Sequence, residues 1–218
     1  MITLALDAST YTASVAVLRD GHRLVERSVA MKGAHEERLM PSVAEALEHA
    51  GVDVAELGRV VCGAGPGSFT SLRIAGGIAK GLASGTGCAL YAVPSLALIV
   101  ASATRPPGRY VAVLDALRGD RYIGVYQVDA TGEVTELQSA RIEPAEAVPD
   151  LASAKGAVLV GPNEDVGGEP AARGVLHLER LLAARGPVDV ASWEPEYGRL
   201  AEAQVRWETT HGRPLPPA

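Results

Sequence analysis

A glycine-rich turn lies where a short apolar segment, Arg59–Cys62, meets a helix-forming one, and it reads Gly63-Ala64-Gly65-Pro66-Gly67-Ser68. Backbone N–H groups of such a turn, with the positive end of the following helix, can hold a phosphate group. The third glycine of a dinucleotide fingerprint is missing, no Gly-Lys-Ser/Thr occurs, and Pro66 removes one donor. These departures favour a tight strand-to-helix connection, with Ser68 or Thr70 as N-cap, over a phosphate site.

Two carboxylates, Asp7 and Asp115, follow apolar segments that we expect to be strands. Enzymes built on sheets often place metal-binding carboxylates at strand ends, where their environment tunes their pKa. The run Asp7-Ala8-Ser9-Thr10 is also an ordinary turn initiator, because Asp and Ser side chains bond to nearby backbone groups. The structural role is favoured, and a ligand role for either residue stays open.

Other catalytic and metal-binding patterns are absent from the sequence. The segment His35-Glu36-Glu37-Arg38-Leu39 has Leu39 where a zinc-protease helix needs its second histidine. No Gly-x-Ser-x-Gly marks a serine nucleophile, and no two histidines share a helix face. We therefore expect no catalytic residue, no metal ligand and no cofactor. The histidines are scattered at His22, His35, His49, His177 and His211.

The elements that position these residues form two similar series, joined by the linker Thr104–Arg109. Apolar alternation and turn residues predict, in the first series, strands Ile2–Asp7, Thr12–Arg19, His22–Val29, Arg59–Cys62 and Cys88–Val93, and helices Glu36–Ala50, Thr70–Ala83 and Ser95–Ala103. The second series has strands Tyr110–Asp115, Arg121–Val128, Glu133–Ile142 and Ala157–Val160, and helices Pro144–Ser153 and Val175–Ala184. We predict an N-terminal lobe over 1–103 and a second lobe over 104–218, with the option that the C-terminal tail returns to the first lobe.

The predicted helix Thr70–Ala83 has too few polar residues to face water. Arg73 and Lys80 form its one polar edge, and Gly77 and Gly81 permit close approach of another backbone. Such a helix is either a central core helix or a core helix with a second, helix-binding face. The two apolar stripes are Ala75, Ala79 and Ala83, and Ile74, Ile78 and Leu82.

Composition is that of an acidic globular protein. The 218 residues carry a net charge of -6, with 47% hydrophobic and 21% charged residues, which argues against a large basic surface for nucleic acid. Cys62 and Cys88 lie in apolar segments and are expected to be core residues. We expect no signal peptide, no membrane span and a cytoplasmic location, since the longest apolar run, Leu96–Ala101, is far too short to cross a bilayer.

Several segments together resemble the TsaB family, also called YeaZ, a non-catalytic component of bacterial tRNA threonylcarbamoyladenosine formation. Ser71 and Ala75 stand where that family usually has glycine. The likeness is weaker in the second lobe, although Gly161-Pro162 and Glu196–Arg199 lie where similar family elements fall. The segments that carry it are Leu4–Thr10 with Ser14–Val17, His35–Pro41, Gly65–Ala75, Lys80–Ala83, Val93–Leu96 and Asp115–Tyr122.

The resemblance implies an α/β fold of two ribonuclease-H-like lobes, as in the actin-like ATPase (ASKHA) superfamily, which the echo of Leu4–Asp7 in Val111–Asp115 also suggests. It implies a scaffold that binds and activates a TsaD-like catalytic subunit, together with a TsaE-like ATPase, contacts tRNA only indirectly or weakly, and can form a homodimer when alone. The alternatives are a small-molecule kinase or ATPase using Asp7 and the glycine turn, or a glycoprotease-like hydrolase. The expected interface comprises Leu39, Met40, Val43, Leu47, Leu72, Arg73, Ala75, Gly76, Ala79, Lys80 and Ala83.

Overall fold

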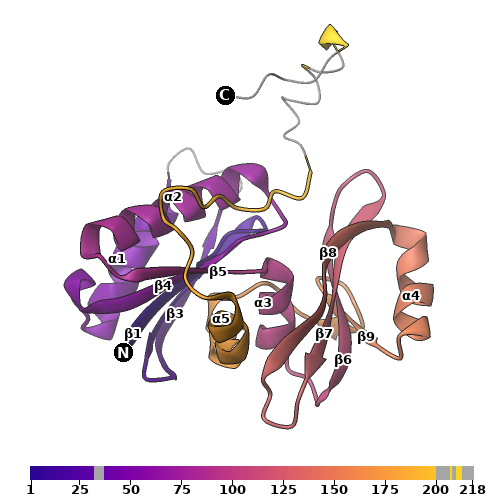
Figure 1. Ribbon diagram of the computed structural model, residues 1–218, viewed down its shortest axis with the longest axis horizontal. Helices are drawn as coiled ribbons and strands as arrows, with labels where there is room; N and C mark the ends of the chain where they lie inside the picture. Colours follow the sequence, from indigo (N-terminus) through magenta and orange to yellow (C-terminus); the bar gives the residue numbers. More distant parts are fainter. Residues whose placement is uncertain (32–36, 200–206, 208–209, 213–218) are drawn as a thin grey trace.

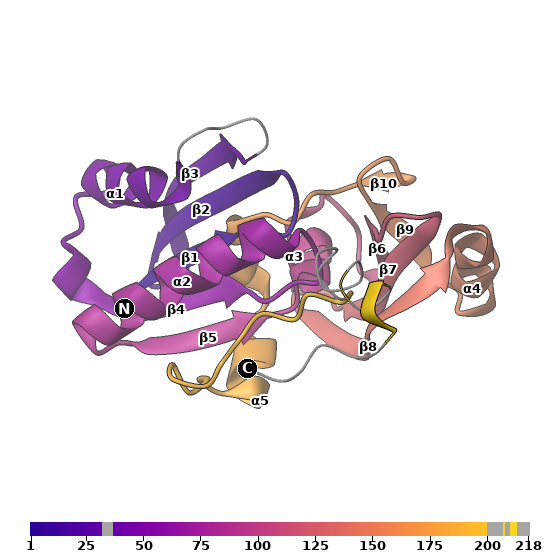
Figure 2. The same ribbon diagram turned by 90° about the horizontal axis from the view of Figure 1, so that it is seen from above.

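The structure of the protein is a computed structural model, which describes residues 1–31, 37–199, 207 and 210–212. Its strands form two five-stranded sheets, one from each half of the chain, with helix α3 (Ser95–Ser102) between them (Figure 1). Both sheets are mixed, and helices pack against their faces (Figures 1 and 2).

The first sheet has the order β3-β2-β1-β4-β5. The first three strands form an antiparallel meander, and the last two run parallel to β1. Asp20 and Gly21 both have positive φ in the two-residue turn between β2 and β3, which matches the right-handed twist of a hairpin. The strands are β1 (Ile2–Asp7), β2 (Thr12–Arg19), β3 (His22–Ala30), β4 (Leu57–Gly63) and β5 (Ala89–Val93).

The second sheet has the order β10-β9-β6-β7-β8, which read from its other edge repeats the order of the first. Again three antiparallel strands are followed by two that run parallel to the first of them. This repetition confirms the predicted fold class, α/β with two ribonuclease-H-like halves of the same strand order. The strands are β6 (Gly108–Asp115), β7 (Asp120–Val128), β8 (Val134–Pro144), β9 (Val158–Gly161) and β10 (Val166–Gly167).

Helices α1 (Leu39–Ala50) and α2 (Phe69–Thr86) cover one face of the first sheet. Because side chains alternate along a strand, Leu4 and Leu6 of β1 pack in the core under α1 and α2, whereas Ala5 between them packs with α3. A short helix, α4 (Val148–Ala154), packs on the outer face of the second sheet after the 3-10 turn Ala145–Ala147. Another 3-10 turn, Val54–Glu56, precedes β4.

One core joins the two halves. Every residue from Leu96 to Ala101 of α3 is buried, and the helix belongs to one hydrophobic cluster with residues of both sheets, including Val61 and Leu114. After β10 the chain returns to the first sheet through the 3-10 helix η3 (Ala172–His177) and α5 (Glu179–Arg185), and the Val188 N–H then donates to the Leu90 carbonyl at 2.8 Å.

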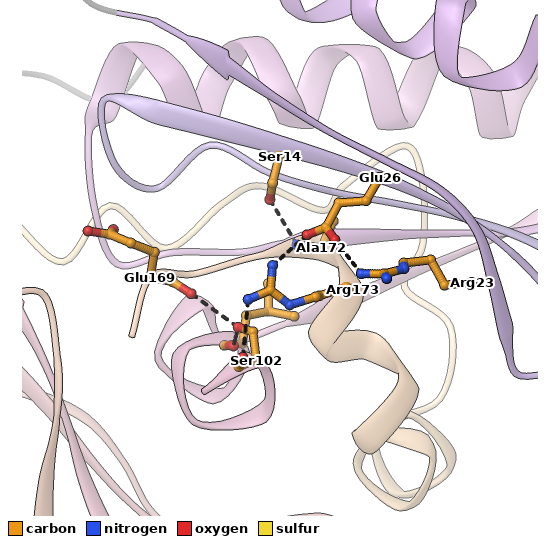
Figure 3. Close-up of polar contacts among 8 residues, drawn as sticks. Ser14, Arg23, Glu26, Ser102, Glu169, Ala172 and Arg173 are labelled. Atoms are coloured by element: carbon orange, nitrogen blue, oxygen red, sulfur yellow. Dashed lines mark hydrogen bonds and ion pairs between the residues drawn. The ribbon is translucent and has the colours of Figure 1, made fainter. Parts of the chain in front are cut away.

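Polar contacts hold this returning segment in place (Figure 3). The guanidinium of Arg173 donates to Glu26 of β3 at 2.6 Å and to the carbonyl of Ser102, at the end of α3, at 3.2 Å. The Ala172 N–H donates to the Ser14 hydroxyl at 2.8 Å. The first sheet, α3 and the returning segment therefore form one connected unit, while the predicted boundary at residue 103 stays a prediction.

Several element ends differ from the predictions for local reasons. Helix α1 begins at Leu39, because the Glu37 carboxylate accepts the N–H groups of Leu39 and Met40; Glu36, the predicted start, lies outside the described residues. The predicted helix Val175–Ala184 is instead η3 followed by α5, because Leu178 leaves helical geometry and is wholly buried. The segment predicted as helix Pro144–Ser153 contains a 3-10 turn before α4, and β10 was not predicted.

Cys62 is buried and Cys88 is half-buried, and both are free thiols. Burial raises the pKa of the Cys62 thiol well above its ordinary range. Within the described ranges, no helix combines the length and the apolar character needed to cross a membrane.

Candidate protein interface and the site closed beside it

Most of the predicted interface residues serve the chain's own core. Eight of the eleven are buried, and only Met40, Arg73 and Lys80 retain exposed side-chain surface. The alanine stripe of α2 faces the sheet, because small side chains let the helix approach the strands closely. The eight buried residues are Leu39, Val43, Leu47, Leu72, Ala75, Gly76, Ala79 and Ala83.

The open face of α2 is a stripe of glycines. Gly77, Gly81 and Gly85 follow Arg73 at steps of four residues, so all four lie along one line of the helix. A Cβ atom on any of these glycines would meet nothing within 4 Å. Beside this stripe, Ile74 and Ile78 are half-buried and pack against the core between the first sheet and helices α1 and α2. The sequence pointed to Gly77 and Gly81 as a close-approach pattern but not to Gly85, and neither the glycines nor the isoleucines were among the expected interface residues.

Helix α1 adds a second strip to the same surface. Glu45 pairs with Arg27 of β3, so that flank of α1 points toward the sheet edge. Met40 and Ala44 are exposed on the opposite flank, which faces α2 because α1 covers β2 and β3 and α2 covers β4. Met40 keeps 40% of its surface exposed. The glycine face, as we call Arg73, Gly77, Gly81 and Gly85, thus adjoins an apolar flank of α1.

The other flank of α2 is covered by the segment Trp193–Arg199, which we call the strap (Figures 1 and 2). The Lys80 ammonium donates to the Trp193 carbonyl at 2.9 Å. Pro195 lies against Gly76, where a Cβ would come within 3.0 Å of the proline ring. The strap therefore engages Gly76 and Lys80, two residues expected to contact a partner. A small depression between α2 and the strap is lined by Arg73, Gly77, Glu194 and Tyr197, among others.

Asp7 is wholly buried and its carboxylate accepts three hydrogen bonds. It accepts from the Ser9 N–H at 2.9 Å, the Ser9 hydroxyl at 2.7 Å and the Ser95 hydroxyl at 2.5 Å. Burial raises the pKa of Asp7, with these hydrogen bonds opposing the shift. A Cβ on Gly63 would lie 1.9 Å from the carboxylate. Asp7 thus ties the β1–β2 turn to the start of α3, which is the structural role favoured by the sequence.

Asp115, the corresponding residue of the second sheet, belongs to a separate and exposed network. Its side chain is 64% exposed and accepts from the Leu117 N–H at 3.0 Å and from Arg121 at 3.1 Å. Among the residues that the structure describes, no group of three or more His, Cys, Asp and Glu gathers as a metal site would require.

Backbone N–H groups of the glycine turn form hydrogen bonds within the chain itself. The Gly65 N–H donates to the Ser95 hydroxyl at 3.0 Å, and the Ser68 N–H donates to the Ser9 carbonyl at 2.7 Å. Gly65 has φ +97°, whereas Gly67 has no positive φ and is required because a Cβ would lie 2.1 Å from the Ser9 carbonyl oxygen. Ser68 is at the N-cap position of α2 without the expected side-chain cap; its hydroxyl lies 3.1 Å from that of Ser71.

Comparison with known proteins identifies the family. Residues 29–157, more than half of the chain, match the family described as TsaD: tRNA N6-adenosine threonylcarbamoyltransferase. The tRNA threonylcarbamoyladenosine biosynthesis protein TsaB of Bacillus subtilis is 29% identical, over 95% of this chain and 98% of that protein. The Escherichia coli TsaB is 35% identical over 61% of this chain and 58% of that protein. The structure of YeaZ from Pseudomonas aeruginosa superposes with a TM-score of 0.77 and 31% identity, over 90% of this chain and 99% of that chain. The chain therefore belongs to the family that this TsaD description covers and, within it, to the TsaB (YeaZ) proteins.

Proposed function

We propose that the chain is a non-catalytic scaffold subunit in tRNA threonylcarbamoyladenosine biosynthesis, the process for which its relatives are named. In this proposal it binds and activates a TsaD-like catalytic subunit, and a TsaE-like ATPase joins the same assembly. A net charge of -6 is consistent with a subunit that contacts tRNA weakly and leaves most of that contact to its partners.

The observation that carries the proposal is the glycine face of α2. A glycine inside a helix lowers helix stability by about 0.5–1 kcal/mol relative to alanine. Gly77, Gly81 and Gly85 have open space around them, so no contact within the described part of the chain requires them to lack a side chain. Close approach of a helix from another subunit would require it, because a Cβ there would hold the two backbones apart.

The surroundings of the glycine face suit a protein partner. Ile74 and Ile78 on α2 and Met40 on α1 supply apolar surface next to it. Arg73 adds a cation at one end; its guanidinium lies 5.5 Å from the Phe69 ring. An apolar centre with a cationic, aromatic edge is the composition of interface centres in general.

The kinase or ATPase alternative would need Asp7 and the glycine turn to face a nucleotide. Asp7 is instead enclosed by serine donors, and the Gly65 and Ser68 N–H groups are bonded within the chain. These contacts support the scaffold proposal, and calorimetric titration of the isolated chain with ATP and magnesium tests it. Micromolar, magnesium-dependent binding would favour the alternative.

The binding face is tested by Gly81→Gln, which adds a side chain in open space. We expect the variant to fold as the parent does and to bind a TsaD-like subunit at least about tenfold more weakly, measured by calorimetry. Gly167→Gln is the matched control, because Gly167 in β10 is equally open and lies in the other half. Unchanged affinity of Gly81→Gln would contradict the proposed face.

The same face would serve a homodimer when the partner is absent. Light scattering of the isolated parent and of Gly81→Gln tests whether a homodimer uses this face. If the parent is a dimer and the variant is a monomer, the dimer forms through the glycine face.

A further inference from the structure

The strap does more than cover one flank of α2, because its end passes between the two halves of the molecule. Gly198 has φ +74°, and a Cβ there would lie 2.5 Å from the Tyr122 ring of β7 and 2.9 Å from Pro66 of the glycine turn. The strap backbone therefore fills the space between the glycine turn of the first half and β7 of the second.

Polar contacts attach the strap on both sides. The Glu196 N–H donates to the Ala64 carbonyl at 2.7 Å, in the first half. On the side of the second half, the Tyr122 hydroxyl donates to the Tyr197 carbonyl at 3.4 Å, and Arg199 forms an ion pair with Asp120.

The strap also contacts the beginning of α2. The Tyr197 ring lies 4.4 Å from that of Phe69, the first residue of α2. Gly65 is in close contact with the strap and with α2, since a Cβ there would lie 2.3 Å from the Glu196 carbonyl oxygen and 2.9 Å from Leu72. The first turn of α2 is thus held between the core and the strap.

We propose that Tyr197, Gly198 and Arg199 are positioning residues for the partner-binding face. They fix the first turn of α2 against β7, and so set the direction in which Arg73 and the glycines behind it meet a partner. This inference rests on the proposed function, because it assumes that α2 carries the binding face.

The first test is Gly198→Ala in the full chain, with Gly186→Ala as the matched control. Both glycines have positive φ, near +70°, but only Gly198 has neighbours that a Cβ would strike. We expect Gly198→Ala to bind the TsaD-like subunit at least about tenfold more weakly, and Gly186→Ala to bind within about twofold of the parent.

Hydrogen exchange locates the effect. In Gly198→Ala, amides of residues 69–73 and 193–199 should exchange faster, while those of α1 keep the parent rates. Faster exchange of the strap with unchanged partner affinity would overturn the inference. So would parent-like exchange of the strap, because the contacts described above would then not be what holds it.

The second test is a charge exchange at the Arg199–Asp120 ion pair, whose side chains are about a quarter to a third exposed and should tolerate substitution if Gly198→Ala fails to fold. Arg199→Asp should weaken partner binding, and Arg199→Asp combined with Asp120→Arg should restore it. A general loss of stability would not be rescued in this way, so failure of the double variant to recover affinity counts against positioning.

The outcome also separates this inference from the function on which it rests. If Gly81→Gln loses the partner while Gly198→Ala keeps it, only the role of the strap is wrong. If Gly81→Gln keeps the partner, the glycine face itself is not the binding site.

Discussion

The two sheets repeat one strand order but are covered differently. In the first half, β4 is followed by α2, a helix of 18 residues whose outer stripe contains three glycines with open space around them. In the second half, the chain after β9 makes a turn and the two-residue strand β10, and the helix before β9, α4, has seven residues. The repeated sheet therefore provides the frame, while the helices of the first half provide the surface available to a partner.

The turns that follow the first strand of each sheet differ in the same way. Asp7 is buried and bonded to two serines, whereas Asp115 is largely exposed. Three successive residues after Asp115, from Leu117 to Gly119, have positive φ, and Leu117 is 62% exposed. The first turn is part of a core and the second is part of the surface. Substitutions at corresponding places should consequently have unequal effects.

The largest effect is expected for Ala79→Glu in α2. Ala79 is fully buried against the first sheet, and an unpaired carboxylate there should lower the free energy of unfolding by about 3–5 kcal/mol. Urea denaturation measures this. The exposed counterpart Ala154→Glu, at the end of α4, should change stability by less than about 0.5 kcal/mol. Ala79→Glu thus reports on the core, and a parent-like stability would show that this stripe of α2 is not packed as described.

The next largest effect is expected for Gly67→Val. A Cβ at this position would lie 2.1 Å from the Ser9 carbonyl oxygen, so the turn must shift, at a cost of about 1–3 kcal/mol. The same shift would move α2, and we expect lower affinity for a TsaD-like subunit along with a lower melting temperature. Gly119→Val, at a turn with open space, should cost about 1–2 kcal/mol from its positive φ alone and leave partner affinity unchanged.

Asp7→Asn and Asp115→Asn compare the two turns directly. An amide at position 7 cannot accept from all three donors, and leaving a buried group unsatisfied costs about 1–3 kcal/mol. At position 115 the amide oxygen can still accept the Leu117 N–H, and the exposed pair with Arg121 contributes less than about 1 kcal/mol. Equal losses in chemical denaturation would mean that the two turns are alike after all.

A smaller effect of opposite sign is expected on the glycine face. Gly81→Ala should stabilise the isolated chain by about 0.5–1 kcal/mol, because alanine favours the helix and nothing lies near its Cβ. The same substitution should weaken partner binding. A variant that is more stable and binds its partner less tightly separates folding from function at one position. Gly167→Ala in the second half should leave partner binding unchanged.

The smallest expected effect is the pH dependence of the free energy of unfolding that is lost in Asp7→Asn. Burial raises the folded-state pKa of Asp7 above 3.8, so its stabilising contribution is complete below that value and is lost as pH rises through the folded pKa. The difference in unfolding free energy between the parent and Asp7→Asn should therefore shrink as pH rises above about 4. A difference that grows with pH would mean that the serine hydrogen bonds outweigh desolvation.

The sequence by itself determined the elements and their class. Apolar alternation located the strands from β1 to β9, since side-chain direction in a strand is a local property. The Asp20-Gly21 turn and the small residues of α2 were likewise visible, because turn and packing chemistry depend on residue type. The helix boundaries at Leu39 and Leu178 were not visible in the sequence. The first depends on a hydrogen bond to the Glu37 side chain, and the second on burial of Leu178 in the core.

Tertiary structure alone decided which stripe of α2 is free. The sequence shows two apolar stripes and a glycine pair without stating which one the sheet covers, and the expected interface included Ala79 but not Gly77. The sheet covers the alanine stripe. The strap contacts Gly76 and Lys80, although it lies more than a hundred residues away in sequence. Burial depends on such long-range contacts, which residue spacing within one helix cannot encode.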